Sequence, residues 1–321
     1  MEGIDHLRLA DVPDPQPAAR EVVLDVLYAA LNPADRYLAE AQYPAKPPLP
    51  HILGRDGVGV VRSVGPGVTA FRAGDTCVVL RGHTGVDRAG TFAQQVAVDV
   101  DSLVPVPQGW TLPQASCATL VYLTAYQALT MWGDLPAKAN VLITGASGGV
   151  GVASTQLAQA MGYTVLALSR SAEKQRQLKD LGAAVAFDPQ DANWGKQVRD
   201  FLGGPRVDLA IDNIGGTLFN AVLGTLGNDG RVSCVGRLAG PVPEFNTASL
   251  FFRRLRVGGV AVGSYSRDEA HEAWTAVLKV LDASGARPMI DHVFDFDQLP
   301  QAFNRLAEGP MGKVLVKVSP S

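Results

Sequence analysis

Apolar positions in the middle of the chain alternate between short runs and helical spacings. Residues 141–143 form an apolar run that ends in a glycine-rich turn at 145–151. From this turn to Met161, apolar residues recur at i, i+3 and i+4, the spacing of a helix with one buried face. Gly162, a residue suited to a left-handed C-cap, separates this helix from a β-branched run at 164–168. The segment therefore predicts one βαβ unit of about 30 residues.

The same alternation continues toward residue 262. It predicts strands over four further segments, 184–187, 207–211, 231–235 and 257–262. It also predicts helices over 172–181, 194–202 and 219–226. Counted from the run at 141–143, six predicted strands alternate with helices. That order is typical of an α/β protein with a doubly wound parallel sheet of the Rossmann type.

The flanking segments follow a different pattern. Residues 21–30 read as a clear strand, and 51–80 alternate glycine turns with short β-branched runs, which predicts a small, curved β structure. Toward the other end, the pattern predicts helices over 270–281 and 299–307 and a strand over 312–318. We therefore expect three stretches along the chain: a β-rich part at 1–114, an α/β part at 115–264 and a last part at 265–321.

Three glycines, Gly145, Gly148 and Gly151, define the turn after the first strand of the βαβ unit. A missing side chain lets the backbone turn sharply, lets a phosphate approach the helix N-terminus, and lets helix and strand pack closely. The spacing departs from strict G-x-G-x-x-G, and glycine turns are common in α/β proteins. Within a complete βαβ unit, however, they predict a dinucleotide site. The backbone of Gly148, Gly149 and Val150 is expected at its pyrophosphate.

The identity of the dinucleotide is predicted from the end of the second strand. A protein selective for NAD usually places Asp or Glu about 20 residues after the glycines. This chain instead has Ser169, Arg170 and Ser171, with Lys174 one helical turn further on. Hydroxyls and cations are partners of a phosphate monoester, so NADPH is the expected cofactor, bound by Ser169, Arg170 and Lys174. The alternative is that both cations are solvated and a serine merely caps the helix.

Two further residues follow predicted strands at their carboxyl ends. Ligands of doubly wound sheets bind beyond these ends. Asn213 comes after the strand at 207–211, and Gly236 comes after the strand at 231–235. Both are therefore expected at the cofactor. Simple turn chemistry is the alternative for Asn213 and for its neighbour Gly215.

Composition places the chain among ordinary globular proteins. Its 321 residues are 47% hydrophobic and carry a formal charge of −3, so no basic excess favours nucleic acid or an anionic membrane. No uninterrupted apolar run approaches the roughly 20 residues of a membrane-spanning helix. The three cysteines lie far apart and are odd in number, which argues against a disulfide framework. We therefore expect a cytoplasmic protein without nucleic-acid or membrane partners.

Motifs spread over nearly the whole chain carry a family resemblance. In chain order they are Asn32-Pro33-x-Asp35, Gly54-x-Asp56-Gly57-x-Gly59, Gly65-x-Gly67, Gly74-Asp75, Leu123-Thr-Ala-Tyr-Gln-Ala-Leu129 and Gly148-Gly149-Val150-Gly151. Together they resemble the medium-chain dehydrogenase/reductase superfamily, most closely its zinc-independent, zeta-crystallin-like quinone oxidoreductases. The resemblance implies a Rossmann cofactor domain at 115–264 and a GroES-like catalytic domain that is discontinuous, built from 1–114 and 265–321.

The resemblance also implies roles for residues outside the glycine turn. It places Thr124 near the nicotinamide, and it places Lys313, in Gly312-Lys313-Val314, near the cofactor. A solvated lysine at the start of a strand is the alternative for Lys313. Phe251 is implied at the wall of the substrate pocket. A homodimer paired through the edge strand at 257–262 is implied as well.

The chain departs from its zinc-dependent relatives at the metal positions. Those relatives carry cysteine where Asn32 stands and Gly-His-Glu where this chain has Gly54-Arg55-Asp56. The thiolate and the imidazole that zinc prefers are both missing, and 81–95 contains none of the cysteines of a structural zinc site. No metal is therefore expected. Without a metal, alcohols are poorly activated, and hydride addition to an already electrophilic acceptor is the chemistry that remains easy.

The expected reaction is hydride transfer from NADPH to a small molecule, a quinone or an α,β-unsaturated carbonyl. Asn32 and Tyr43 are the catalytic candidates, because their donors could stabilise charge that develops on the acceptor oxygen. Tyr37 and Arg55 are candidates for the substrate pocket. The alternatives are that Tyr37 belongs to the core and that Arg55 simply pairs with a carboxylate.

Two other functions stay open at this stage. In the enoyl-thioester reductases of the superfamily, a tyrosine at the position of Tyr43 is a proton donor. Such an enzyme needs basic residues for the phosphates of the thioester, for which Lys46, Arg253 and Arg254 are a thin set. The other function is a non-catalytic one, in which the protein binds NADPH or serves a structural role on a reused fold.

Overall fold

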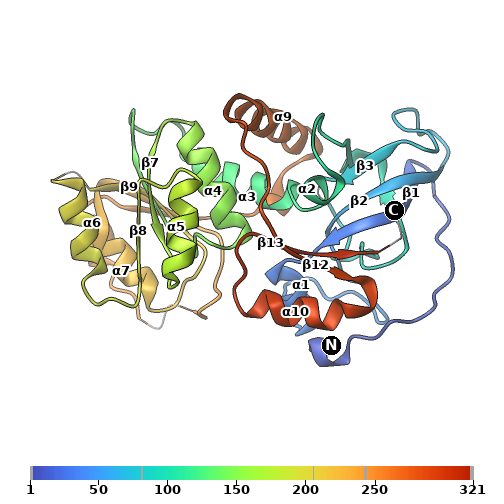
Figure 1. The fold of residues 1–321 in the computed structure, drawn as a ribbon, viewed down its shortest axis with the longest axis horizontal. Coiled ribbons are helices and arrows are strands. Elements are labelled where there is room, and N and C mark those ends of the chain that lie inside the picture. Colours follow the sequence, from blue (N-terminus) through green and yellow to red (C-terminus); the bar gives the residue numbers. More distant parts are fainter. Residues whose placement is uncertain (1–2, 81, 205, 242–243, 319–321) are drawn as a thin grey trace. The chain divides into compact units, whose positions relative to one another are not determined.

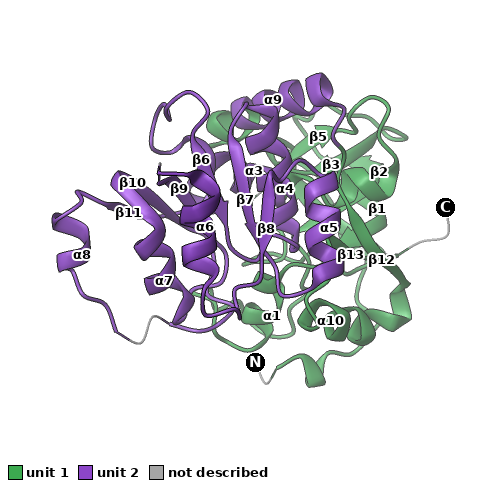
Figure 2. Cartoon of the chain, turned by 60° about the vertical axis from the view of Figure 1, so that its left-hand side comes forward, with its two compact units in different colours: residues 1–120, 265–271, 287–321 green, residues 121–264, 272–286 purple. Residues whose placement is uncertain are grey.

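A computed structural model describes residues 3–80, 82–204, 206–241 and 244–318. These residues form two compact units, coloured separately in Figure 2. Unit 1 comprises the described residues up to 120, those at 265–271 and those from 287 onward, and unit 2 comprises 121–264 and 272–286. The first boundary thus falls at 120, where the sequence suggested 114. Of the expected return segment, residues 272–286 belong to unit 2 and the remaining described residues belong to unit 1.

Unit 2 is built on a parallel sheet of six strands. In chain order they are β6 (Asn140–Ile143), β7 (Thr164–Leu168), β8 (Val185–Phe187), β9 (Val207–Asp212), β10 (Leu226–Cys234) and β11 (Arg256–Gly259). Their spatial order is β11-β10-β9-β6-β7-β8, and every neighbouring pair is parallel. This is the doubly wound order, in which the direction of winding reverses between β6 and β9. The predicted Rossmann fold is confirmed.

Helices cover both faces of this sheet (Figure 1). They are α3 (Thr119–Thr130), α4 (Gly149–Ala160), α5 (Ala172–Asp180), α6 (Trp194–Leu202), α7 (Leu218–Thr225) and α8 (Ala248–Phe251). Trp194 of α6 and Phe219 of α7 share one apolar core with strand residues such as Leu142 and Ala210. Helix α4 is buried all round from 151 to 158, not on one face as its periodicity predicts.

Unit 1 is β-rich, as the glycine-punctuated pattern predicts. Its sheet joins β1 (Glu21–Ala30), β2 (Asp56–Val64), β3 (Thr76–Val79), β4 (Gln95–Asp99), β5 (Leu103–Pro105), β12 (Ile290–Asp295) and β13 (Lys313–Lys317). The order is β12-β13-β1-β2-β3-β5, and β4 pairs with β1. Helices α1 (Pro33–Ala39), α2 (Leu112–Ser116) and α10 (Leu299–Ala307) lie in this unit, and α3 and α9 (Arg267–Ser284) begin in it and end in unit 2. Single 3₁₀ turns occur at Ile4–His6, Val100–Ser102, Val262–Ser264 and Phe296–Gln298.

The return of the chain completes unit 1. Strand β13 pairs antiparallel with β1, so that Tyr28 lies opposite Lys317 and Ala30 opposite Leu315. Phe303 of α10 is fully buried and meets the ring of Phe92 edge to face at 5.9 Å. The first and last parts of the chain therefore share one sheet and one hydrophobic core, as the resemblance implies.

Strand β11 is the edge of the sheet in unit 2. It is shorter than the strand predicted at 257–262, because Val262 belongs to a 3₁₀ turn. Val257 of β11 is 39% exposed, and Phe251 and Phe252 of α8 are 64% and 78% exposed. This part of unit 2 thus presents large apolar side chains to solvent.

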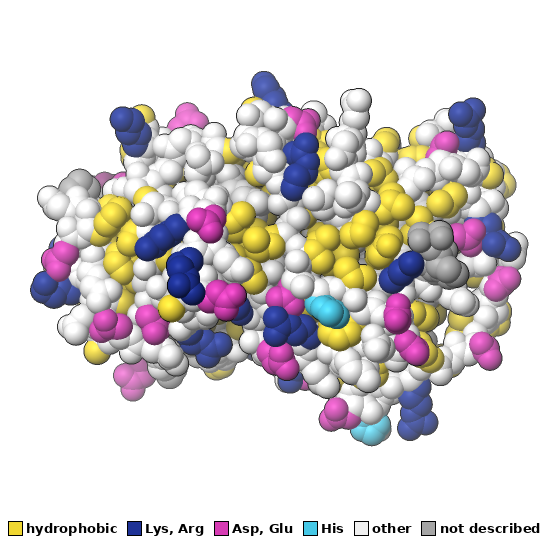
Figure 3. Space-filling view, viewed as in Figure 1, with side chains coloured by type: hydrophobic (Ala, Val, Ile, Leu, Met, Phe, Trp, Pro, Cys, Tyr) yellow, Lys and Arg dark blue, Asp and Glu magenta, His cyan; other side chains and the backbone are white. Residues whose placement is uncertain are grey.

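Charge is mixed on the surface. On the face drawn in Figure 3, Lys and Arg side chains alternate with Asp and Glu, and no broad field of one sign forms. This agrees with the small formal charge of −3. Within the described ranges, none of the helices has the length and apolar character needed to span a membrane.

Candidate active site

The carboxyl ends of four neighbouring strands of unit 2 meet at one edge of its sheet. The turn at 144–151 follows β6, Ser169 follows β7, Asn213 follows β9 and Gly236 comes just after β10. Because the strands are parallel and adjacent, these segments share one rim. Residues of all four segments are predicted cofactor ligands, and the structure brings them together within unit 2.

The glycine turn is shaped by close backbone contact. Gly145 has φ +57°, in the left-handed region. A Cβ at Gly151 would lie 2.4 Å from the carbonyl oxygen of Gly145, so helix α4 approaches the turn more closely than a side chain allows. Gly148 is the N-cap of α4, and no side chain within the described part of the chain caps this helix start. Its first N–H groups can therefore serve an anion such as a pyrophosphate.

Asn213 is held firmly beside this turn. Its Nδ2 donates to the carbonyl oxygen of Thr144 at 2.8 Å, and its main-chain N–H donates to the Thr144 hydroxyl at 2.9 Å. The Thr144 hydroxyl in turn donates to Asp212 at 2.7 Å. Oδ1 of Asn213 is buried and accepts no hydrogen bond from any described residue. A buried acceptor of this kind costs free energy unless a ligand hydroxyl or amide fills it, so the rim fits a dinucleotide.

The residues predicted to select NADPH begin at the end of β7. Ser169 is buried at 6% exposure, whereas Arg170 is exposed. Ser171 is the N-cap of α5 and accepts from the N–H of Lys174 at 3.4 Å. The capping alternative is therefore correct for Ser171. Ser169 and the side chains of Arg170 and Lys174 stay the predicted partners of a phosphate.

The remaining cofactor and substrate candidates differ in their burial and contacts. Thr124 is buried on α3. A Cβ on Gly236 would come within 2.7 Å of the Asn213 carbonyl oxygen, so the strand end passes close to Asn213. The N–H of Gly215 bonds Asp212, which is turn chemistry. Phe251, assigned to the substrate wall, is largely exposed on α8.

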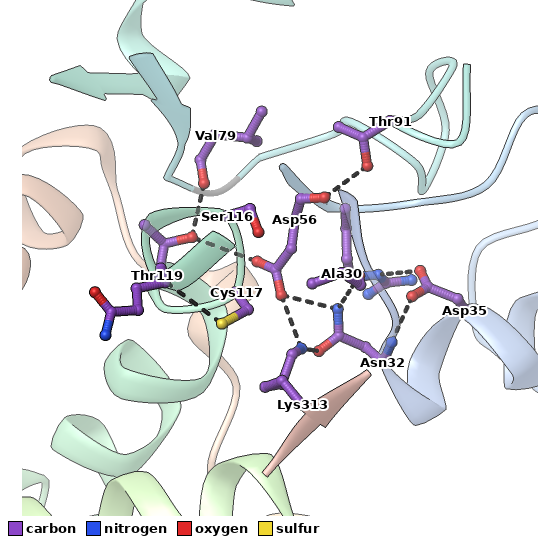
Figure 4. Close-up of polar contacts among 12 residues, drawn as sticks. Ala30, Asn32, Asp35, Asp56, Val79, Thr91, Ser116, Cys117, Thr119 and Lys313 are labelled. Atoms are coloured by element: carbon purple, nitrogen blue, oxygen red, sulfur yellow. Dashed lines mark hydrogen bonds and ion pairs between the residues drawn. The ribbon is translucent and has the colours of Figure 1, made fainter. Parts of the chain in front are cut away.

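Unit 1 holds a buried polar cluster formed by Asn32, Asp56, Lys313 and Thr119, shown in Figure 4. Nζ of Lys313 lies 2.6 Å from Oδ1 of Asn32 and 3.1 Å from Oδ2 of Asp56. Nδ2 of Asn32 donates to the same Asp56 oxygen at 3.0 Å and to the Ala30 carbonyl at 3.3 Å. The Thr119 hydroxyl lies within hydrogen-bond distance of Asp56 Oδ1, at 3.3 Å.

This cluster changes the expectations for two residues. Lys313 is only 5% exposed, so the alternative of a solvated lysine is wrong. Asn32 uses its amide hydrogens on Asp56 and Ala30, so it holds the cluster together more readily than it donates to a substrate. Donation from Asn32 to the acceptor oxygen stays a prediction.

A second buried pair lies next to the cluster. Arg55 Nε donates to Oδ1 of Asp35 at 3.2 Å, and the other Asp35 oxygen accepts from the Asn32 N–H at 2.8 Å. Nη1 of Arg55 donates to the Tyr43 hydroxyl at 3.3 Å, and the guanidinium carbon lies 4.8 Å from the centre of that ring. The pairing alternative for Arg55 is thus correct, and the same side chain also contacts Tyr43.

Burial and neighbouring charges set the charge states of Asp35, Arg55 and His51. Burial raises the pKa of Asp35 above its ordinary value, although Arg55 and the Asn32 N–H oppose the rise. Burial acts to lower the pKa of Arg55, but Asp35 and the Tyr43 contacts outweigh it and raise the pKa, so the guanidinium stays charged. Burial also lowers the pKa of His51, and the charge of Arg55 lowers it further, against the Gly85 backbone and Asp87. His51 is therefore neutral at pH 7.

Several residues of the site were missed from the sequence. Asp56 belonged to a quoted motif but received no role, and Thr119, His51 and Asp212 were not assigned to the site. The signal for Asp56 was present, because it stands at the glutamate position of the zinc-dependent motif. Tyr37, a predicted pocket residue, is half-buried on α1.

The donor set does not fit zinc. The positions of the metal ligands hold an amide, a guanidinium and a carboxylate, and the ammonium of Lys313 lies against two of them. Zinc requires deprotonated thiolate, imidazole or carboxylate ligands, not cations. Among the residues that the structure describes, no three His, Cys, Asp or Glu side chains are grouped so that they could hold a metal ion.

A doubly wound sheet with a dinucleotide rim and a separate β-rich unit with a buried polar cluster define the class of medium-chain dehydrogenases and reductases. Comparisons with known proteins agree. The family model described as "Alcohol dehydrogenase GroES-like domain" matches residues 18–108, and the one described as "Zinc-binding dehydrogenase" matches residues 149–283.

Individual relatives cover nearly the whole chain. A quinone oxidoreductase of Lama guanicoe is 30% identical over 318 residues, which are 98% of this chain and 94% of the relative. An acryloyl-coenzyme A reductase of Sulfurisphaera tokodaii is 27% identical over 333 residues, 97% of this chain and 96% of the relative. The chain belongs to the zeta-crystallin-like quinone oxidoreductase family of the medium-chain dehydrogenase/reductase superfamily.

Solved structures show the same architecture. The crystal structure of an NAD-dependent alcohol dehydrogenase has a TM-score of 0.90 at 29% identity, covering 99% of this chain and 97% of the other. The structure of a mycobacterial protein complexed with NADPH has a TM-score of 0.89 at 26% identity, covering 98% of this chain and 97% of the other.

Proposed function

We propose that this protein is an NADPH-dependent oxidoreductase that reduces a quinone or an α,β-unsaturated carbonyl. The quinone oxidoreductase of Lama guanicoe supports the acceptor, and the mycobacterial structure with NADPH supports the cofactor. The observation that carries the direction of the chemistry is the cluster of Asn32, Asp56 and Lys313. It puts an ammonium group where a dehydrogenase would hold zinc, so the site has no Lewis acid with which to activate an alcohol.

Bound NADPH supplies the hydride. The chain's own part begins at the rim of unit 2, where the N–H groups at the start of α4 hold the pyrophosphate and Oδ1 of Asn213 accepts from the cofactor. In unit 1, the charged and hydroxyl groups near Tyr43 bind the acceptor and offset the negative charge that reduction places on its oxygen. Preorganised donors of this kind are often the largest single contribution to such a reaction.

The function is tested by following NADPH oxidation against a panel of acceptors. We expect turnover with quinones and alkenals and none with NADP⁺ and simple alcohols. Turnover with any acceptor excludes the non-catalytic alternative. Stoichiometric zinc in the purified protein, or alcohol oxidation as the main activity, would overturn the proposal.

Cofactor selectivity is tested at Arg170. The exposed guanidinium at the start of α5 suits the 2′-phosphate of NADPH, although one structural relative is named as NAD-dependent. A charge-assisted hydrogen bond contributes about 1.5–3 kcal/mol, so Arg170→Ala should weaken NADPH binding by roughly 10- to 100-fold and leave NADH binding unchanged. Arg176→Ala, within α5, is the control. Equal affinity of the unchanged protein for both cofactors would contradict the assignment.

An enoyl-thioester reductase is the second candidate, supported by the acryloyl-coenzyme A reductase among the relatives. Of the cations considered for the thioester's phosphates, Lys46 bonds the Ala41 carbonyl, Arg253 bonds two main-chain carbonyls and Arg254 pairs with Asp229. Because these three cations already bond groups of the protein itself, the structure favours a substrate without phosphates. A kcat/KM for a short enoyl-coenzyme A above that for every quinone would favour the thioester instead.

We also propose that the protein is a homodimer paired through β11. The exposed edge of that strand and the exposed side chains of Val257, Phe251 and Phe252 support this arrangement. Light scattering should then give about twice the chain mass of 33.8 kDa, and Val257→Lys should shift the protein toward the monomer. A monomer at all concentrations would contradict it.

The proposed compartment is the cytoplasm. The three cysteines are free, and two of them are buried, which suits a reducing environment. Cell fractionation with an antibody against the protein tests this proposal.

A further inference from the structure

One guanidinium nitrogen of Arg55, Nη2, carries N–H groups that no described residue satisfies. The side chain is only 10% exposed. Its Nε donates to Asp35 and its Nη1 donates to Tyr43, but Nη2 is buried and finds no hydrogen-bond partner within the described residues. An unpaired buried donor costs about 1–3 kcal/mol, and more when it is charged. A donor left in this state indicates a ligand that supplies the missing acceptor.

The surrounding contacts fix this donor in place. Asp35 is fully buried and accepts from both Arg55 and the Asn32 N–H, so the Nε side of the guanidinium is anchored at the start of α1. The ring of Tyr43 lies 4.8 Å from the guanidinium carbon and limits its motion on another side. Because the guanidinium is planar and rigid, fixing two of its nitrogens also fixes the direction of the third.

The other candidates for an acceptor-binding cation are occupied. The ammonium group of Lys313 donates to Asn32 and Asp56, and the amide of Asn32 donates to Asp56 and Ala30. Nε2 of His51, four residues before Arg55, is also buried without a partner among the described residues. Two of the unsatisfied polar atoms of unit 1 thus come from the short segment 51–55, and the charged one of these two is Nη2 of Arg55.

We propose that Arg55 binds the oxygen of the reducible acceptor through Nη2 and holds the negative charge that hydride transfer places on it. This proposal rests on the proposed function and adds a catalytic residue to it. The hydride brings two electrons to the β-carbon of the enone or quinone, the conjugated π electrons move to the carbonyl oxygen, and this oxygen is held by Arg55.

Tyr43 completes the step. Its oxygen accepts from Nη1 of Arg55, so its own hydrogen is directed elsewhere and is available to the acceptor oxygen. Proton transfer from this hydroxyl yields an enol, and water returns the proton to the tyrosine. The enol from an enone then tautomerises to the saturated carbonyl, and the enol from a quinone tautomerises to the hydroquinone. Atoms and charge balance with one hydride and one proton per acceptor.

The test compares Arg55→Lys with Arg305→Lys. Both arginines belong to unit 1 and pair with an aspartate, and Arg305 binds Asp291 at 2.7 and 2.8 Å away from the polar cluster. Lysine keeps a charge for Asp35 but loses Nη2. We expect Arg55→Lys to lower kcat/KM for a quinone by about 100- to 1000-fold, the effect of removing one oxyanion donor. NADPH affinity should change by less than twofold, and Arg305→Lys should keep normal turnover.

A second readout separates charge stabilisation from a merely structural role. In Arg55→Lys, the loss in kcat/KM should be greatest for quinones whose hydroquinones are the weakest acids, because their oxygens carry the most concentrated charge. A structural role would lower turnover equally for all acceptors. Equal losses across the series, or turnover within twofold of the unchanged protein, would overturn the proposal.

A third readout does not depend on activity. Binding of 4-nitrophenolate in the presence of NADP⁺, followed by its absorbance, should weaken at least tenfold in Arg55→Lys and stay unchanged in Arg305→Lys. If the unchanged protein reduces no acceptor but binds the phenolate through Arg55, the proposed function fails while the oxyanion site stands. If Arg55→Lys binds the phenolate normally, the site itself is wrong.

Discussion

Two glycines three residues apart should respond in opposite ways to the same methyl group. In Gly151→Ala, the new Cβ would lie 2.4 Å from the Gly145 carbonyl oxygen and 2.5 Å from the Ala146 Cα, about 1 Å short of ordinary contact, which begins near 3.4 Å. These are backbone atoms and cannot rotate away. In Gly148→Ala, the nearest atom lies 3.5 Å away, and φ is −73°. A Cβ fits there within the protein, but it projects where a phosphate would approach the backbone.

The magnitudes follow from these contacts. Overpacking costs about 1–3 kcal/mol, which corresponds to a loss of roughly 2–12 °C in the melting temperature of a domain of this size. We expect this loss for Gly151→Ala in a thermal scan without cofactor. Gly148→Ala should melt within about 4 °C of the unchanged protein but bind NADPH at least tenfold more weakly, as measured by titration of protein fluorescence. Normal melting of Gly151→Ala would refute the packing argument. Normal NADPH affinity of Gly148→Ala would falsify the placement of the pyrophosphate.

Three further predictions concern the buried groups. Lys313→Met should lower the free energy of unfolding by about 3–5 kcal/mol, because it leaves the Asp56 carboxylate buried without a cation. In urea titrations, adding Asp56→Asn to this variant should recover at least half of the loss. No recovery in the double variant would contradict the pairing of Lys313 with Asp56. His51 has a lowered pKa in the folded protein, so the unfolded chain takes up a proton first as the pH falls below about 6.5, and the folded state loses stability. His51→Gln should therefore flatten the fall of the melting temperature between pH 7 and pH 5. An unchanged slope of melting temperature against pH would count against this prediction. Burial raises the pKa of Cys77 and Cys117 to about 12, so iodoacetamide at pH 8 should label neither in the native protein and both in urea, as read by mass spectrometry.

Much of the fold was predictable because local pattern and tertiary role agree in unit 2. The runs at 141–143 and 207–211 became β6 and β9 to within one residue at each end. The rim was predictable for the same reason, since parallel strands oblige their carboxyl ends to meet. The extent of β11 was not, because the glycines after Val257 give no signal for where pairing with β10 stops.

The polar cluster of unit 1 was only partly predictable. Asn32 and Lys313 were both singled out, but their contact joins residues 281 positions apart in the sequence. No periodicity encodes such a pairing, because it follows from the antiparallel register of β1 and β13. The ion pair of Arg55 with Asp35 is similar, since the sequence allowed several carboxylates and only the fold selects one. The depth at which these charges lie is a property of the assembled sheet.

The pairing of β13 with β1 has a consequence for biosynthesis. A ribosome that adds about 5–20 residues per second needs roughly 14–56 s to pass from the first of these strands to the last. During that interval β1 lacks its neighbour β13, whereas the six strands of unit 2, the last of which ends at Gly259, are all complete in the nascent chain before β13 is made. We therefore expect the middle of the polypeptide to mature first, with the early strands dependent on chaperones until the final segment arrives.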